Sequence, residues 1–116
     1  MSVAPESITD DQMRERLSKL KPYTVMILHR TSKLGEPGMD QIVHEHGRRN
    51  FALRASGKIS IICPVNDGSD VTGVAVFNTD PEEAKKIYDE DPGVKAGIFS
   101  FEVHPTRSFP GDSLAP

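Results

Sequence analysis

Residues 72–104 read TGVAVFNTDPEEAKKIYDEDPGVKAGIFSFEVH, and this stretch decides the fold. The run Thr72–Asn78 is rich in β-branched residues, so it predicts a strand. Asp80 then fits a helix N-cap with Pro81 in the first helical position, and the helix that they begin must end before Pro92. Ile98–His104 predicts another strand. The stretch is therefore a strand, a helix and a strand in succession.

Upstream of this unit, the same signals predict a further strand, helix and strand. Tyr23–His29 is apolar and β-branched, Met39–Ser56 carries apolar residues on one helical face, and Lys58–Cys63 is another strand-like run. The turn-rich Asn66–Asp70 joins that run to the next strand as a hairpin. This order predicts an α+β fold with a ferredoxin-like βαββαβ protomer, whose antiparallel sheet carries both helices on one face.

The two ends of the chain fall outside this unit. We expect three parts: an N-terminal helical extension over residues 1–22, the ferredoxin-like domain over 23–104, and a proline-rich C-terminal tail over 105–116. Thr9 or Asp10 fits the N-cap of a short helix that continues through Lys21 and is stopped by Pro22. The sequence leaves open whether this extension is a loosely packed arm in solvent or docks onto a partner subunit.

The predicted strands are apolar on both faces, although two helices can cover only one face of the sheet. A sheet with one face in water should alternate apolar and polar residues. The runs that fail to alternate cleanly are Val25–Leu28, Ile59–Ile62, Val74–Phe77 and Ile98–Val103. Since monomers rarely expose such a face, we expect a second copy to cover it and form a homodimer. The alternative is that the N-terminal helix covers the sheet of its own chain.

The composition excludes several classes of protein. The 116 residues suit one domain, and a net charge of −3 lacks the basic surface of a nucleic-acid-binding protein. The apolar runs are far shorter than the ~20 residues that span a bilayer, and the first residues show no secretory signal. A single cysteine, Cys63, fits a cytoplasmic protein. No phosphate-binding glycine loop and no dinucleotide motif occurs in the sequence, and we expect no cofactor.

His46 is the first candidate for chemistry. The apolar stripe of the helix over 39–56 passes through positions 39, 42, 43, 46, 50 and 53, so His46 and Asn50 lie on the face that points inward. A buried imidazole needs partners for both ring nitrogens. One interpretation is a core histidine satisfied by Asn50 or by the backbone. The other is a general acid or base, because histidine titrates nearest to neutral pH.

Asp91 is the second candidate, and it has two possible roles. It can cap a short turn whose first residue is Pro92, or its carboxylate can also face the site and hold His46; the spacing does not decide between them. His44 lies two residues before His46, so the two point in different directions on a helix and cannot share one ion. With one cysteine in the chain as well, we expect no metal site.

The motifs resemble those of the YciI-like proteins, the YCII-related domain family. The resemblance covers residues 23–104, and its most specific part is the run Asp91-Pro-Gly-Val-Lys-Ala-Gly97. The other matching parts are the strand from Tyr23, the helix that carries His46, the strand over Gly57–Pro64 with its terminal proline, and the Glu-Glu-Ala helix from Pro81. The chain departs from the family pattern at Gly47, Asn50 and Cys63 and in its longer ends. The first two changes would make a pocket roomier and more polar.

The resemblance implies a dimeric α+β barrel in which His46 and Asp91 form the catalytic site. One branch of the family resembles dehydrochlorinases that act on chlorinated hydroxyquinols by proton transfer without a cofactor. We therefore expect a small-molecule enzyme or binder, with elimination or isomerisation as its reaction, and Asn50, Cys63 and Pro64 as its substrate-binding residues. The alternative is a non-catalytic module that binds a ligand or a partner protein and in which His46 is structural.

Overall fold

The computed structural model describes residues 7–116, so the expectation about a secretory signal falls partly outside the described residues. Six elements form the βαββαβ unit: β1 (Lys21–Arg30), α2 (Met39–Ala55), β2 (Ile59–Pro64), β3 (Val71–Phe77), α3 (Pro81–Asp89) and β4 (Phe99–Ser108). Three short elements are added: α1 (Asp10–Leu17), the 3-10 helix η1 (Ser32–Gly35) and α4 (Pro92–Lys95). The predicted order of strands and helices is confirmed.

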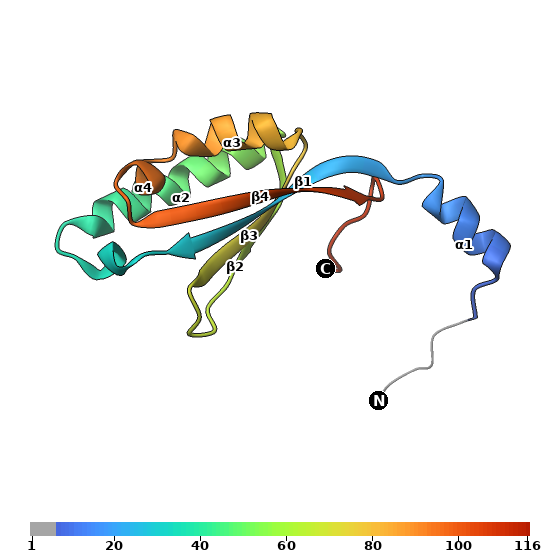
Figure 1. Ribbon diagram of the computed structural model, residues 1–116, viewed down its shortest axis with the longest axis horizontal. Helices are drawn as coiled ribbons and strands as arrows, with labels where there is room; N and C mark the ends of the chain where they lie inside the picture. Colours follow the sequence, from blue (N-terminus) through green and yellow to red (C-terminus); the bar gives the residue numbers. More distant parts are fainter. Residues whose placement is uncertain (1–6) are drawn as a thin grey trace.

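The four strands form one antiparallel sheet in the order β2-β3-β1-β4. Met26 at the centre of β1 pairs with Ala75 of β3 and with Val103 of β4, which fixes these three side chains on the same face. Helices α2 and α3 lie together on that face, and no helix of residues 7–116 lies over the opposite face (Figure 1). This is the ferredoxin-like α+β protomer that the sequence predicts.

The core lies between the helices and the sheet. Apolar side chains from every strand and from α3 meet there, because residues two apart on a strand point to the same face. The fully or nearly fully buried ones are Met26, Leu28, Ile59, Ala75, Phe77, Ala84, Tyr88, Ile98 and Phe99. Helix α2 contributes apolar residues that are only partly buried, and its one buried residue is His46. A histidine at such a position needs polar partners inside the core.

Local capping accounts for where the helices begin. Asp80 accepts a hydrogen bond from the backbone N–H of Glu83 at 2.8 Å, and Pro81 occupies the first turn of α3, as predicted. Thr9, rather than Asp10, caps α1: its hydroxyl oxygen accepts from the N–H of Gln12, whose side chain accepts from the N–H of Thr9. Such a reciprocal pair satisfies N–H groups that the first turn of a helix leaves free.

Strands β1 and β4 are longer than the sequence predicts. Lys21 pairs with Ser108, so β1 begins two residues before the predicted start at Tyr23, and β4 runs four residues past His104. The sequence prediction stopped at Pro105 because proline lacks the N–H that a ladder needs. In the structure β4 is an edge strand, a position in which proline is tolerated.

Helix α1 ends earlier than predicted and does not cover the sheet. It stops at Leu17 instead of Lys21, and Pro22 lies within β1, so proline does not end the helix. The helix buries none of its residues and projects beyond the end of the sheet (Figure 1). The alternative in which the N-terminal helix covers the sheet of its own chain is therefore wrong for this structure.

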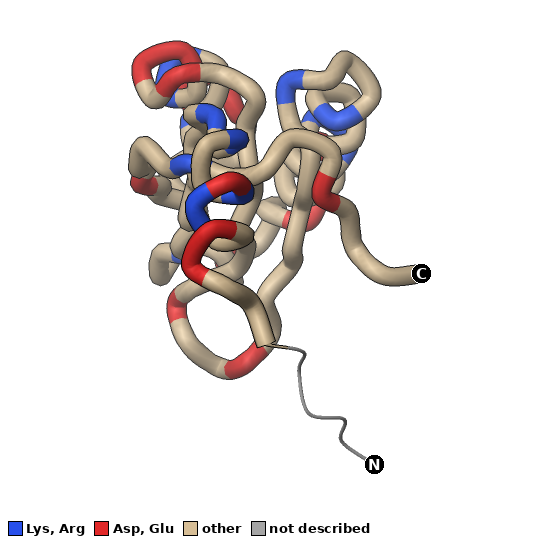
Figure 2. Tube along the Cα trace, turned by 90° about the vertical axis from the view of Figure 1, so that its right-hand side faces the viewer, with Lys and Arg blue, Asp and Glu red and all other residues tan. Residues whose placement is uncertain are grey.

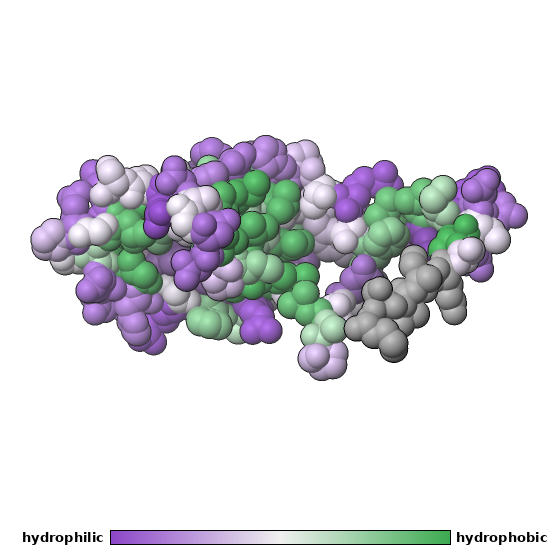
Figure 3. Space-filling view, turned by 90° about the horizontal axis from the view of Figure 1, so that it is seen from below, coloured by the Kyte–Doolittle hydropathy of each residue, from purple (hydrophilic) through white to green (hydrophobic). Residues whose placement is uncertain are grey.

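The uncovered face of the sheet is apolar on three strands and polar on the fourth. The half-buried apolar side chains on β1, β2 and β3 include Val25, Ile27, Ile61, Val74 and Val76. On β4 the same face carries Ser100, Glu102 and His104, so the expectation of two apolar faces fails for this strand. Seen from this side, apolar surface extends over the sheet and appears again near the N-terminal helix (Figure 3). No helix within residues 7–116 has the length and apolarity to cross a bilayer.

Candidate functional site

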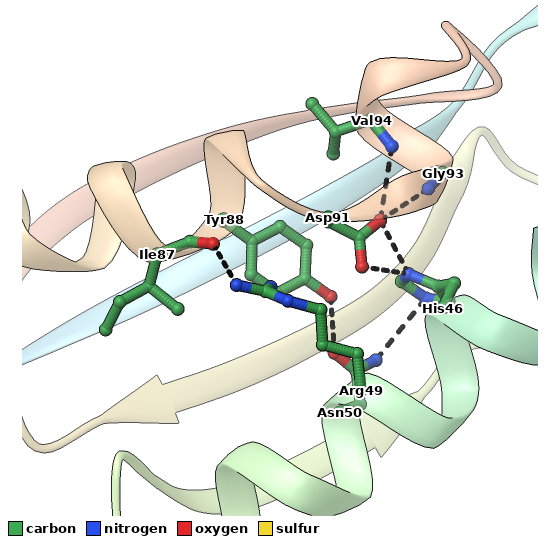
Figure 4. A network of polar contacts seen from close by, with 8 residues as sticks. All are labelled: His46, Arg49, Asn50, Ile87, Tyr88, Asp91, Gly93 and Val94. Carbon is green, nitrogen blue, oxygen red and sulfur yellow. Dashed lines mark hydrogen bonds and ion pairs between the residues drawn. The ribbon is translucent and has the colours of Figure 1, made fainter.

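The site is centred on His46 and Asp91, which the fold brings together. His46 projects from α2 and is 8% exposed, and its Nδ1 atom lies 2.9 Å from Oδ1 and 2.9 Å from Oδ2 of Asp91. The aspartate comes from the loop between α3 and α4 and is fully buried. Figure 4 shows the imidazole and the carboxylate pointing toward each other between α2 and α4. A buried carboxylate is tolerated because it has hydrogen-bonding partners.

Asp91 performs both roles that its sequence position allows. Its Oδ2 atom accepts hydrogen bonds from the backbone N–H groups of Gly93 at 2.9 Å and Val94 at 3.1 Å, which caps α4. The same carboxylate faces His46. These two N–H groups hold the carboxylate in one orientation, and in that orientation it faces the imidazole. The rigid partner is the main structural feature of the site.

Gly93 makes this close arrangement possible. A Cβ atom at position 93 would lie 2.4 Å from the Phe99 ring and 3.0 Å from Oδ2 of Asp91. The Phe99 ring packs on the imidazole of His46 as well, with ring centroids 4.6 Å apart. The glycine in Asp-Pro-Gly therefore leaves the space into which Phe99 packs, and Phe99 shields one side of the histidine from solvent.

The other nitrogen of His46 is also occupied. Asn50, one turn further along α2, places its amide Nδ2 at 3.3 Å from Nε2 of His46. The hydroxyl of Tyr88 donates to Oδ1 of Asn50 at 2.7 Å, which fixes the orientation of that amide. Because Asp91 accepts and the Asn50 amide donates, the network assigns the proton of the neutral imidazole to Nδ1 and the lone pair to Nε2.

Tyr88 is the member of this network that was not predicted from the sequence. Burial raises the pKa of the Tyr88 phenol above its ordinary value, and the nearby Asp91 carboxylate raises it further. The phenol therefore stays protonated and remains a donor to Asn50. A signal was available in the sequence, because a buried tyrosine hydroxyl normally needs a hydrogen-bonding partner.

A small cavity adjoins the network. Its volume is about 20 Å³, and it lies between Asn50 and Tyr88 on one side and the apolar side chains of Met26, Leu28 and Ile62 on the other. A space of this size holds about one water molecule. The cavity is therefore small, with a polar end at Asn50 and Tyr88 and apolar side chains of the sheet along the rest of its wall.

The remaining predicted site residues lie outside this network. Cys63 and Pro64 at the end of β2 are both exposed. Cys63 pairs with Val74 and belongs to the uncovered side of the sheet, whereas Pro64 lines a surface groove beside Phe51. The β2 residues that line the cavity are Ile59 and Ile62. The structure thus joins Asn50 to the pair of His46 and Asp91, but it does not join Cys63 and Pro64 to them.

Two other polar groups near α2 have separate partners. His44 is exposed and its Nε2 atom lies 3.2 Å from Arg48. Arg49 reaches across to α3, where its Nη2 atom donates to the backbone carbonyl of Ile87 at 2.6 Å (Figure 4). Within residues 7–116, no group of three or more histidine, cysteine or acidic side chains is arranged to hold a metal ion.

The fold of this chain resembles that of a known protein. The chain is similar to the solved structure of 5-chloro-2-hydroxyhydroquinone dehydrochlorinase from Burkholderia phenoliruptrix AC1100, in complex with 2,5-dihydroxybenzoquinone. The sequences are 20% identical, the TM-score is 0.48, and the match covers 71% of this chain and 90% of the other. No family model matches the chain, and no curated protein matches it. Membership of the YciI-like family therefore stays a prediction.

Proposed function

We propose that this protein is a YciI-like small-molecule enzyme that performs acid/base chemistry without a cofactor, with His46 as the catalytic group and Asp91 as the residue that positions it. The observation that carries the proposal is the Nδ1 contact with both oxygens of a carboxylate that has no exposure to solvent. Such a partner sets the tautomer and stabilises the imidazolium that forms when Nε2 accepts a proton. Histidine bases held in this way suit elimination and isomerisation.

The proton transfer takes place at Nε2. A substrate C–H or O–H group must come within about 2.6–3.2 Å of this atom for its proton to be taken. In an elimination, the electron pair of the broken C–H bond forms the new double bond, and the leaving group departs with its own pair. In an isomerisation, the imidazolium returns the proton to a different atom of the substrate. Asp91 keeps its negative charge throughout and balances the charge on the ring.

Asn50 is the substrate-binding residue that the geometry supports best. Its amide lies 3.3 Å from Nε2, which is longer than the usual 2.9–3.0 Å of a strong N–H hydrogen bond. A substrate that approaches Nε2 displaces this amide, which then donates to an oxygen of the substrate. The expected roles of Cys63 and Pro64 in binding rest on the family resemblance, since both lie outside the network.

A second candidate function is favoured by one observation. Both nitrogens of the imidazole have partners, and the ring is almost completely buried. A histidine of this kind can be a purely structural member of the core, as in a non-catalytic module that binds a ligand or another protein. In that case the network contributes to stability alone, and no substrate needs to reach Nε2 of His46.

The test compares His46→Gln with His44→Gln, a matched change two residues earlier on the same helix at an exposed position. Turnover of chlorinated and unchlorinated hydroxyquinols is measured for both variants and for the wild type, together with their melting temperatures. The catalytic proposal predicts a loss of about 100- to 10,000-fold for His46→Gln alone. If His46→Gln lowers the melting temperature but turns over substrate as fast as His44→Gln does, His46 is structural.

We also propose that the protein is a homodimer in which the uncovered faces of two sheets pack together, as in a dimeric α+β barrel. The apolar side chains of β1, β2 and β3 on that face support this, because a second copy would remove them from water. The radius of gyration is 17.2 Å, although a compact chain of this length would have about 13 Å. The chain is therefore more extended than a compact domain of its length, and such a shape suits a protomer that packs against a second copy.

The homodimer is tested by sedimentation equilibrium at micromolar concentration. The Ile27→Glu variant places a charge in the centre of the proposed interface, and Glu102→Gln changes a polar residue of β4 beside it. We expect a dimer for the wild type and for Glu102→Gln, and a monomer for Ile27→Glu. A wild-type protein that sediments as a monomer contradicts the proposal.

A further inference from the structure

Helix α1 has an apolar side that no other part of residues 7–116 covers. Ile8, Met13 and Leu17 are 48%, 52% and 46% exposed, respectively, and the helix buries none of its residues. Met13 and Leu17 are four residues apart, so they lie on the same face of the helix. Ile8 precedes the N-cap and Met13 is the fourth helical residue, the two positions that form a hydrophobic staple. The sequence therefore specifies both the helix and an apolar stripe along it.

A helix this short needs a surface to pack against. Isolated helices below about 12–15 residues are marginal in water, and α1 has 8 residues. The capping box at Thr9 and Gln12 helps to start it but leaves the apolar stripe in solvent. The surface that covers the apolar stripe must therefore lie outside the domain that follows α1 in the chain.

The junction between α1 and β1 directs the helix away from its own domain. Ser18 donates its backbone N–H to the carbonyls of Arg14 and Glu15, Lys19 donates to Arg16, and Leu20 donates to Leu17. These hydrogen bonds fix the three connecting residues. Figure 1 shows α1 beyond the end of the sheet, and Figure 2 views the molecule from that end.

A matching surface lies along the β2 edge of the sheet. Phe51 and Leu114 are 68% and 72% exposed, the most exposed of the large apolar side chains in residues 7–116. Both line a groove of about 530 Å³ together with Ile61, Ile62 and Pro64. Ile61 pairs with Val76 and belongs to the uncovered face, so the groove adjoins the surface that the second copy is proposed to cover.

Charged side chains without an ion-pair partner within residues 7–116 lie on both surfaces. Asp10 at the start of α1 and Arg16 near its end have no ion-pair partner within residues 7–116. The groove carries one residue of each sign, Arg54 and Asp112, which are likewise unpaired in the described part of the chain. A helix laid along the groove can place its acidic start near the arginine and its basic end near the aspartate.

We propose that α1 is an arm that packs against a second copy of the chain, with Met13 and Leu17 in the groove between Phe51 and Leu114 of that copy. This inference rests on the proposed homodimer, which it extends from the sheet faces to a reciprocal exchange of N-terminal helices. Each copy then covers the apolar stripe and the apolar groove of the other. The arm is the feature that makes the interface specific to this chain, since the ferredoxin-like unit begins only after it.

The first test measures dimer dissociation by sedimentation equilibrium. Met13→Gln/Leu17→Gln replaces the stripe with polar side chains of high helix propensity, and Glu15→Gln is the control on the opposite side of α1. The double variant should raise the dissociation constant by about tenfold or more, and the control should leave it unchanged. An unchanged constant in the double variant overturns the arm but leaves the homodimer in place. A monomeric wild type overturns both.

The second test locates the arm. Cys63 is the only cysteine, is exposed and lies between the groove residues Ile62 and Pro64. A tagged Leu17→Cys/Cys63→Ser chain is mixed with the wild type and treated with a short bis-maleimide. A crosslink between tagged and untagged chains supports the proposal, and a tagged Glu15→Cys/Cys63→Ser chain should give much less. Absence of that product overturns it, as does an internal crosslink within a Leu17→Cys chain that keeps Cys63.

Discussion

His46 and Asp91 form a buried pair in which one imidazole nitrogen lies 2.9 Å from each oxygen of the carboxylate. The carboxylate has no exposure to solvent and also caps α4 through two backbone N–H groups. One side chain therefore begins a helix and orients the histidine of another helix. Any change that weakens this carboxylate affects both the local structure and the proposed chemistry.

Replacing the Asp91 carboxylate by an amide separates its two roles. Asn caps a helix about as well as Asp does, so the capping part of the interaction persists in Asp91→Asn. The interaction with His46 loses its negative charge inside the core, and we expect a loss of about 1–3 kcal/mol in the free energy of unfolding. Asp80→Asn is the control, because Asp80 is an exposed N-cap followed by proline. Equal effects in urea denaturation would mean that Asp91 acts only as a cap.

The hydroxyl of Tyr88 sets the orientation of Asn50 and, through it, the tautomer of His46. Tyr88→Phe leaves Oδ1 of Asn50 without its donor, so the amide can rotate and present its oxygen to the histidine. We expect a loss of about 0.5–1.5 kcal/mol in the free energy of unfolding. The ¹⁵N NMR signals of His46 should shift from the Nδ1–H form toward a mixture of tautomers. Tyr23→Phe serves as the control, and unchanged His46 signals in Tyr88→Phe would contradict the assignment.

Two glycines should respond to alanine in opposite directions. In Gly93→Ala the new Cβ would meet the Phe99 ring at 2.4 Å, so Phe99 must move away from His46. We expect a destabilisation of about 1–3 kcal/mol. Gly47 lies inside α2 and has open space where a Cβ would be, so Gly47→Ala should stabilise the protein by about 0.5–1 kcal/mol. Thermal and urea unfolding of the two variants measure both values, and a stable Gly93→Ala protein would disprove the packing argument.

The uncovered face contains a carboxylate held by two histidines, and it should make stability depend on pH. A hydrogen bond from His29 and another from His104 hold the pKa of Glu102 below its usual value. A carboxyl group with a lowered pKa in the folded state contributes stability above its unfolded pKa of about 4.3, and this contribution is lost as the pH falls further.

The melting temperature of Glu102→Gln should therefore fall below that of the wild type at pH 6. The difference should shrink as the pH is lowered from 5 to 3, where the folded carboxylate also takes up its proton. Glu15→Gln provides a comparison, because Glu15 is exposed and far from any histidine of the sheet. A difference between wild type and Glu102→Gln that stays constant down to pH 3 would show that the histidines do not stabilise the charged form.

The elements that can be predicted from the sequence are those with local causes. Asp80 and Pro81 begin α3 because a cap and a proline act within one turn, and Gly57 has a φ of +82° at the end of α2, where a residue without a Cβ is favoured. The positions of His46 and Asn50 on the inward face of α2 follow from helical periodicity alone. The ends of β1 and β4 were not predicted. Proline usually ends a strand, and Pro105 is tolerated within β4 because this strand lies at the edge of the sheet.

Local sequence signals account for the order of strands and helices, the inward placement of His46 and the capping position of Asp91, since each depends on residues within about four positions. The contact of Asp91 with His46 over a separation of 45 residues, and that of Tyr88 with Asn50, come from the packing of separate elements. The same packing places the polar side chains of β4 on the uncovered face of the sheet and leaves α1 projecting from the domain. These contacts depend on how α2, α3 and α4 pack on one sheet, and no local pattern encodes the distance between side chains on separate elements.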